Sequence, residues 1–415
     1  MFAPLTEQPP STSDAFWFEA LRRFPDLEAD NLVAVDGTDR LVLAEAGAAL
    51  KSAAPGQVVV IGDRYGAMTL GAIALHGARE VRVHQDLITG EQALALNAIR
   101  AARAMGTERA MAAGLVDGFR QLPLTRELFT GATIVIGQLP KSLDGLREIT
   151  QLAATHCAAD VTVLLGGRLK HMTPAMNEVL GDSFSRVQAS LAHQKSRTLI
   201  ASGPRPEVRS GGATTYPLRE HHLDLDMWVC AHGAAFAGTK IDIGTRFLLE
   251  FLDRMDPAAR NGVDLGCGTG VIATALTRAR PQLSVLATDE SAAAVSSALA
   301  TIAANGLTER VRVLRDDAMS TLAGASVDLV VCNPPFHLGT SVHAGASAKL
   351  FQGAGRVLKP GGQLWTVFNS HLPYRPQLAR AVGPTRVIGR NTKFTVTVST
   401  RSGQRHEQQS WSAPL

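Results

Sequence analysis

One pattern occurs twice in this chain of 415 residues and limits the folds open to it. An apolar strand leads through a glycine loop into an alanine-rich helix, a second strand stops at an acid, and a later strand stops at a polar residue near a proline. The landmarks are, in order, Gly62, Asp86 and Gln138 in the first half and Gly266, Asp289 and Asn333 in the second. The spacings from each glycine, 24 and 76 positions against 23 and 67, agree. Because alternating strands and helices build a parallel sheet covered by helices, we predict an internal duplication of one doubly wound, Rossmann-like α/β domain.

A stretch rich in Gly, Pro and charge separates the two halves. It starts at Gly203–Pro206 and runs to about residue 230. We therefore expect a first domain over residues 1–205, a linker region over 206–230 and a second domain over 231–415. With 45% hydrophobic and 19% charged residues, both halves have enough apolar material for a folded core.

Composition argues against several other classes of protein. The longest apolar runs, such as Val58–Ile61, have the length of strands and not of membrane spans. The first residues lack the pattern of a signal peptide, which favours the cytoplasm. Four cysteines without CxxC spacing and histidines without metal-ligand spacing favour reduced thiols and no metal.

Charge is uneven along the chain. Residues 1–50 carry 3 Lys/Arg against 9 Asp/Glu, whereas residues 351–415 carry 9 against 1. A basic segment suits a phosphate-rich partner, but an ordinary solvated surface gives the same count. Charge alone leaves nucleic-acid binding open.

The second half contains a loop suited to binding a ligand. The strand around Asp264 runs into Gly266-Cys267-Gly268-Thr269-Gly270, and a helix follows. Alternate glycines let the backbone turn sharply and approach a ligand, and the helix start presents unpaired N–H groups. The spacing is GxGxG, whereas dinucleotide dehydrogenases use GxGxxG.

Two acids end the strands that follow. Asp289 stands where a carboxylate can accept both hydroxyl protons of a ribose, although capping of the next helix would also explain it. Asp317, after a third strand, is placed to accept from an adenine amino group, and a solvated turn is its alternative. The order of loop, strand and acid favours a nucleoside ligand.

The most specific motif is Asn333-Pro334-Pro335-Phe336, at the end of an apolar strand. The two prolines force a rigid, extended exit from the sheet. The Asn side chain and the Pro334 carbonyl can then accept from one amino group while Phe336 stacks on a planar base. Acceptors on an exocyclic amine favour the pyramidal nitrogen that attacks a methyl group in line, so we expect methyl transfer to an amino nitrogen.

Together these motifs resemble class I S-adenosylmethionine-dependent methyltransferases that modify amino nitrogens. Further segments are similar to the two-domain bacterial ribosomal RNA guanine-N2 methyltransferases of both ribosomal subunits, namely Ile241–Thr245, Ala304–Leu307, Asn333–His337, Pro360–Gly362 and Asn369–Tyr374. The resemblance covers most of the chain. It departs from the family pattern at Leu338, where a polar residue is usual, and at Ser370, where a basic residue is frequent.

The resemblance implies a set of site residues. The cofactor S-adenosyl-L-methionine would contact Asp264, Gly266, Cys267, Gly268, Gly270, Asp289, Asp317, Ala318 and Asn333, and Phe236, Gly244 and Thr245 would lie in a segment folded over it. Asn333, Pro334, Pro335 and Phe336 would hold the guanine and perform catalysis. The partner it implies is ribosomal RNA or a ribosomal subunit.

The first half is predicted to be an inactive copy. Bulky residues stand in the loop Gly62–Gly66, and Gln138–Lys141 lacks both the Asn and the aromatic residue. We hypothesise that this domain positions RNA, with Lys141 and Arg147 as phosphate contacts, or that it acts as a scaffold.

Three other functions stay open on the sequence alone. The same chemistry could act on a DNA adenine or on a protein glutamine. A nicotinamide-dependent oxidoreductase would leave the Asn-Pro-Pro-Phe motif unexplained, and a non-catalytic RNA-binding protein would leave the intact second-half motifs unexplained.

Overall fold

The computed structural model describes residues 16–106, 108, 114–211, 215–335 and 341–403. Its contacts divide the chain into two compact units. The first comprises Met1–Leu218 with Ala231–Gly238 and Ser291–Ala293, and the second comprises Arg219–Cys230, Thr239–Glu290 and Ala294–Leu415. Within the described residues, no helix combines the length and apolar character that crossing a membrane requires.

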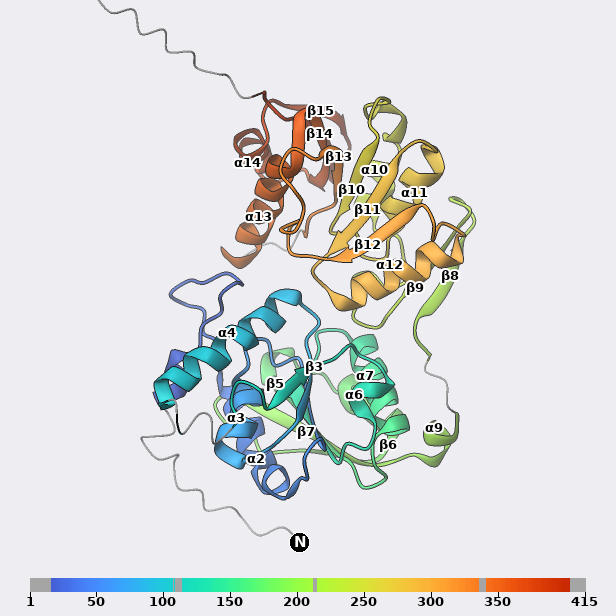
Figure 1. Ribbon diagram of the computed structural model, residues 1–415. Helices are drawn as coiled ribbons and strands as arrows, with labels where there is room; N and C mark the ends of the chain where they lie inside the picture. The colour runs from blue at the N-terminus through green and yellow to red at the C-terminus, as the bar shows by residue number, and fades with distance from the viewer. Residues whose placement is uncertain (1–15, 107, 109–113, 212–214, 336–340, 404–415) are drawn as a thin grey trace, which may run out of the picture. The chain divides into compact units, whose positions relative to one another are not determined.

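The first unit is built on a seven-stranded sheet in the order β3-β2-β1-β4-β5-β7-β6 (Figure 1). The strands are β1 (Val58–Ile61), β2 (Val81–His84), β3 (Phe119–Gln121), β4 (Ile134–Gln138), β5 (Thr162–Arg168), β6 (Phe184–Ala189) and β7 (Ser196–Pro204). The first five pair in parallel, and β7 pairs antiparallel with both β5 and β6. The parallel strands need crossover connections, which the helices supply.

Helices connect and cover these strands. They are η1 (Phe16–Ala20), α2 (Gly37–Ser52), α3 (Ala67–His76), α4 (Ile88–Met105), α6 (Arg126–Phe129), α7 (Leu143–His156), η2 (Leu169–His171), α8 (Ala175–Ser183) and α9 (Pro206–Gly211). The caps explain where they begin: the Asp36 side chain accepts from the backbone N–H groups of Thr38 and Asp39 at α2, and Ser142 accepts from Gly145 at α7.

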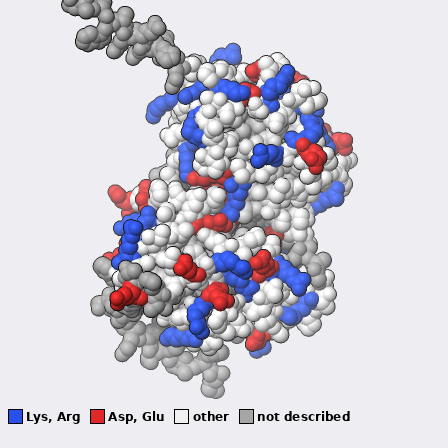
Figure 2. All heavy atoms as spheres, viewed as in Figure 1, with Lys and Arg blue, Asp and Glu red and all other residues white. Residues whose placement is uncertain are grey.

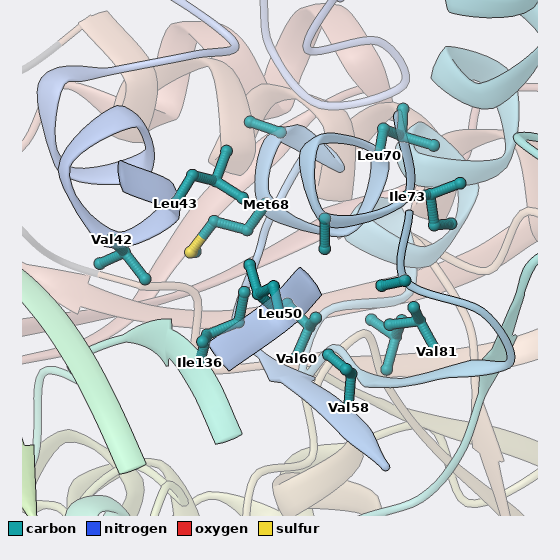
Figure 3. Close-up of a cluster of buried hydrophobic side chains, with 14 of the residues drawn as sticks. Val42, Leu43, Leu50, Val58, Val60, Met68, Leu70, Ile73, Val81 and Ile136 are labelled. Atoms are coloured by element: carbon teal, nitrogen blue, oxygen red, sulfur yellow. The ribbon is translucent and has the colours of Figure 1, made fainter. Parts of the chain in front are cut away.

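Both faces of the first sheet are buried. Val58 and Val60 belong to one hydrophobic cluster, whereas Val59 and Ile61 belong to another. Successive side chains of a strand point to opposite faces, so the continuous apolar runs of the sequence correspond to strands covered on both sides. Figure 3 shows the first cluster, in which Leu50 of α2 and Met68 of α3 lie against the sheet.

The second unit repeats this architecture. Its sheet has the order β12-β11-β10-β13-β14-β16-β15, the order of the first sheet with each strand replaced by its counterpart. The strands are β10 (Asn261–Leu265), β11 (Ser284–Asp289), β12 (Val311–Arg315), β13 (Val327–Cys332), β14 (Leu358–Asn369), β15 (Thr385–Arg390) and β16 (Phe394–Thr400). The two antiparallel strands again stand at the same end. The predicted duplicated, doubly wound fold is confirmed.

The remaining elements surround this sheet. The helices are α10 (Ile243–Leu249), η3 (Leu252–Arg254), α11 (Val271–Ala279), α12 (Ala292–Ala304), α13 (Ser341–Val357) and α14 (Tyr374–Ala381). A separate ribbon consists of β8 (Leu218–His222) and β9 (Met227–Ala231). As in the first sheet, alternate strand residues enter two different clusters, as Leu329 and Val330 of β13 do.

Charged side chains of both signs lie among one another on the face shown in Figure 2. On this face, surface charge therefore indicates no more about the partner than the charge count of the sequence does.

Candidate functional site

The ends of four parallel strands bring the predicted ligand residues of the second unit together. Leu265, the last residue of β10, is in register with Thr288 of β11 and with Cys332 of β13. Asp289 is in register with Arg315, the last residue of β12. The glycine loop, the acids and Asn333 thus leave the sheet at its carboxyl edge, where open α/β sheets bind ligands.

The glycine loop has a backbone that requires glycine. Gly266, Gly268 and Gly270 have φ of 72°, 51° and 79°. Among the residues that the structure describes, no atom would lie within 4 Å of a Cβ on Gly266 or Gly268, whereas one on Gly270 would lie 3.1 Å from the Cα and Cβ of Ala298. Gly270 is therefore needed for packing against α12, and the other two glycines leave room for a ligand to approach the backbone.

Asp289 fixes this loop directly. Its Oδ2 accepts from the backbone N–H of Gly268 at 3.0 Å, and the N–H groups of Gly266 and Cys267 donate to the Thr288 carbonyl. The predicted ribose acid thus also holds the glycine loop against β11.

Asp264 is a fully buried acid beneath the loop. Its Oδ2 accepts from the N–H of Ala273 in α11 at 2.8 Å, and its Oδ1 has no hydrogen-bond partner among the described residues. Burial, with a contribution from the nearby charge of Asp289, raises its pKa from 3.8 to about 7. A buried acceptor without a donor is uncommon in folded proteins and indicates that this site is built to receive one.

Two adjacent acids, Asp316 and Asp317, follow β12, and they have different roles. Asp316, which is buried, accepts from Thr321 and from the Ser320 hydroxyl and so holds its own turn together. Asp317 forms an ion pair with Lys349 of α13, a partner that the sequence did not suggest. Ala318 has a left-handed backbone, with φ of 50°, which sets the direction of the chain after Asp317.

Asn333 has the most informative contacts of the site. Its Nδ2 donates to Asp242 Oδ2 at 3.0 Å and to Thr245 Oγ1 at 2.8 Å. Its Oδ1 is buried and has no partner among the described residues. Pro334 is buried and Pro335 is exposed. The sequence motifs predicted Thr245 as a site residue but not Asp242. Asp242 could have been suspected because it caps the helix that contains Thr245.

The remaining residues singled out from the sequence either lie outside the described residues or contact other protein groups. Phe336, His337 and Leu338 are outside the described residues. Gly244, at the start of α10, donates its N–H to Asp242. The hydroxyl of Ser370 hydrogen bonds with Thr395 of β16.

Both cysteines at this edge are buried. Burial raises the pKa of Cys267 and of Cys332, and the charges of Asp264 and Asp289 add to the effect. Both therefore stay thiols at neutral pH and are poor nucleophiles.

The first unit shows what the same edge looks like when the loop is filled. The buried Asp63 carboxylate accepts from the N–H groups of Met68 and Thr69 at the start of α3. A Cβ on Gly66 would lie 2.6 Å from a methyl group of Leu94. Gln138, the counterpart of Asn333, donates to Asp39. At this edge the Asp63 carboxylate and the Gln138 amide are thus bonded to groups of the first unit itself.

The fold and the site define a methyltransferase, and comparisons with known proteins agree. The methyltransferase small domain family matches residues 226–398, and the RLMG N-terminal domain family matches residues 11–205. Ribosomal RNA large subunit methyltransferase G of Streptomyces avermitilis is 33% identical over 384 residues, which are 91% of this chain and 95% of that protein. The same protein of Streptomyces coelicolor is 34% identical over 392 residues, covering 92% and 97%. The chain belongs to the ribosomal RNA large subunit methyltransferase G family.

A solved structure agrees on the fold. The T. thermophilus 16S rRNA N2 G1207 methyltransferase (RsmC), in complex with AdoMet and guanosine, has a TM-score of 0.64 and 20% identity over 88% of this chain and 92% of its own. The predicted family and enzyme class are confirmed, and the oxidoreductase and the non-catalytic binder are set aside.

Proposed function

We propose that this chain transfers the methyl group of S-adenosyl-L-methionine to the exocyclic N2 of a guanine in large-subunit ribosomal RNA. One observation carries the proposal: the Asn333 amide is held at the carboxyl edge of the sheet with its oxygen buried and without a partner among the described residues. That oxygen can accept from an exocyclic amino group. The names of the relatives support the RNA acceptor.

The second unit suits the cofactor in two respects. The Gly266–Gly270 loop has open space where side chains would stand, and Asp264 Oδ1 needs a donor. When bound, S-adenosyl-L-methionine supplies an electrophilic methyl group on a sulfonium. We assign the glycine loop, Cys267 and Asp264 to its methionine part, Asp289 to its ribose, and Asp317 and Ala318 to its adenine.

The chain needs no strong base for this reaction. As the nitrogen forms its bond to the methyl carbon, the carbon–sulfur bond would break and the nitrogen would become cationic, so that its proton becomes acidic and passes to solvent. Asn333 Oδ1 with the Pro334 carbonyl would hold the amino protons until then. Acceptors on these protons draw the nitrogen lone pair out of conjugation and toward the methyl group. We assign Pro335 to rigidity of the exit from β13 and Phe336 to stacking on the base. Gly244 and Thr245 close the cofactor side.

The two halves would divide the work. We propose that residues 231–415 perform the chemistry, that residues 206–230 link the halves, and that residues 1–205 position the RNA, with Lys141 and Arg147 as phosphate contacts, or act as a scaffold. Ribosomal RNA as the partner also favours a cytoplasmic location.

The test is methylation with a label. The purified protein is incubated with methyl-labelled cofactor and, separately, with small subunits, large subunits and naked ribosomal RNA from cells lacking it. Digestion to nucleosides should place the label in N2-methylguanosine of large-subunit RNA. Label in another nucleoside, in protein or in DNA would refute the proposal, as would no label despite measured cofactor binding. The Asn333→Ala variant should bind cofactor and lose turnover.

A further inference from the structure

The hydrogen bonds around Asn333 specify more than its place in the site. Asn333 donates both hydrogens of its Nδ2 group, one to Asp242 and one to Thr245. We propose that Asp242 and Thr245 are positioning residues that hold this amide in one orientation, with only its oxygen toward the substrate, and so make the site select an N–H donor. The inference rests on the proposed function and adds two residues and a specificity to it.

The orientation follows from what each group can do. The nitrogen and the oxygen of an amide are nearly equal in size, so packing alone does not decide which way the group points. An ionised carboxylate can only accept hydrogen bonds. If the Asn333 amide were reversed, its oxygen would lie about as close to Asp242 Oδ2 as its nitrogen does now, 3.0 Å. Two acceptors would then face each other, and the reversed orientation is excluded.

Asp242 is itself held firmly. It is the cap of α10, and the Oδ2 that accepts from Asn333 also accepts from the N–H groups of Gly244 and Thr245, at 2.8 and 3.1 Å. One carboxylate oxygen thus joins the start of a helix to the catalytic amide. Because the start of α10 fixes the Asp242 carboxylate, the Asn333 amide that donates to it is also held in one direction.

Burial makes this orientation matter. Thr245 is 8% exposed, and Asn333 Oδ1 is buried. Water cannot replace a lost partner here as it would on a surface, so removing an acceptor leaves a buried donor unsatisfied. Rotation of the Asn333 amide would avoid this unsatisfied donor, but it would also turn Nδ2 toward the substrate.

The consequence is a choice between groups of the base. Guanine presents an amino group at N2, which donates, and an oxygen at O6, which accepts. An amide locked as an acceptor favours the amino group and repels the oxygen. A freely rotating amide would bind both edges, and the base would dock in more than one way.

The test separates orientation from capping. In Asp242→Ser the serine hydroxyl still caps α10 but is too short to reach Asn333. Thr245→Val keeps the side-chain shape and removes the second acceptor, whereas Thr245→Ser keeps that acceptor. We expect Asp242→Ser to lower the single-turnover methylation rate about 10- to 100-fold, the range of a hydrogen bond that involves a charged group. Thr245→Val, which removes a hydrogen bond between neutral groups, should lower it about 2- to 10-fold. The cofactor Kd of Asp242→Ser should change less than about threefold, and Thr245→Ser should recover most of the rate that Thr245→Val loses.

A second measurement reads the orientation without turnover. In protein labelled with ¹⁵N-asparagine, the Asn333 side-chain signals are identified by their loss in Asn333→Ala. We expect them to shift and to exchange faster with water in Asp242→Ser but not in Asp36→Ser, a cap change on α2 of the first unit. If wild-type protein labels no RNA, the proposed function fails while these signals still report on the amide.

Three results would overturn the inference. They are unchanged Asn333 signals in Asp242→Ser, a methylation rate in Asp242→Ser within twofold of wild type, and a loss of cofactor affinity that parallels the loss of rate. The last would make Asp242 a structural residue only.

Discussion

Asp264 allows a quantitative test of how the second unit tolerates a buried acid. Its side chain is fully buried, and burial raises its pKa from 3.8 to about 7. Replacing it by Asn keeps the shape and the acceptor for the Ala273 N–H and removes the ionisation. In the absence of cofactor, we expect Asp264→Asn to become more stable relative to wild type as the pH rises.

The sign and the size follow from the two pKa values. The folded protein binds the Asp264 proton more tightly than the unfolded chain does, so the stability linked to that proton is fully present below about pH 3.8 and is lost as the pH rises through about 7. At about 1.36 kcal/mol per pH unit, the whole loss is about 4 kcal/mol, of which about 3 kcal/mol falls between pH 5 and pH 8.5. Asn does not titrate, so the difference in unfolding free energy between variant and wild type should change by about 3 kcal/mol in favour of the variant.

Urea denaturation at pH 5, 7 and 8.5 without cofactor measures this change. Any pH-independent cost of the amide cancels in the comparison between pH values. Asp328→Asn is the matched control: burial alone would raise the pKa of Asp328, but hydrogen bonds from Lys359 and from two backbone N–H groups outweigh it and lower the pKa. The difference in unfolding free energy between Asp328→Asn and wild type should not change between pH 5 and pH 8.5. A flat or falling difference for Asp264→Asn would show that the reasoning about burial is wrong.

Two further predictions concern the same edge of the sheet. Gly270→Ala, with φ of 79° and a new Cβ 3.1 Å from Ala298, should lose about 2–4 kcal/mol of unfolding free energy in urea denaturation. Gly306→Ala, where φ is 69° and no described atom lies within 4 Å of the new Cβ, should lose about 1 kcal/mol, and equal losses would contradict the packing argument. Cys267 and Cys332 should react with a thiol reagent at least about tenfold more slowly than free cysteine, because burial raises their pKa values. Bound cofactor should slow the reaction further. Fast modification that the cofactor does not slow would contradict a buried position of these thiols beside the cofactor.

The sequence predicted what depends on local pattern. Two similar series of strands, loops and helices are enough to determine a duplicated sheet, because each strand pairs by its apolar run. Several helices also start at a glycine or a capping residue, as α2, α3, α7, α10 and α11 do. The ligand edge follows from topology, since Gly266 and Asn333 come directly after parallel strands and Asp289 is the last residue of one. No side-chain contact had to be known for these conclusions.

What the sequence did not predict are contacts between distant residues. Asp242 reaches Asn333 across 91 positions, and Lys349 reaches Asp317 across 32. A capping Asp and a helical Lys look the same in a sequence whether or not they touch a site. Only packing decides this, and packing depends on the whole unit.

The two units satisfy the same helix N–H group in different ways, and the difference accounts for one loop being filled and the other open. Thr69 in α3 and Ala273 in α11 stand at the same position after their glycine loops. In the first unit the carboxylate comes from Asp63 in the loop, and both of its oxygens are used. In the second unit it comes from Asp264 in the strand, which keeps the loop thin and leaves one carboxylate oxygen without a partner in the described part of the chain.

This comparison predicts the outcome of moving the carboxylate. Val60 and Asp63 are the counterparts of Asp264 and Cys267, so Cys267→Asp with Asp264→Val recreates the first arrangement in the second unit. The double variant should unfold at a urea concentration close to that of wild type and lose cofactor affinity by at least about 100-fold. Cys267→Asp alone should be much less stable, because two buried carboxylates would then compete for one helix start. Cofactor affinity retained in the double variant would show that the free oxygen of Asp264 and the thin loop are not what the cofactor requires.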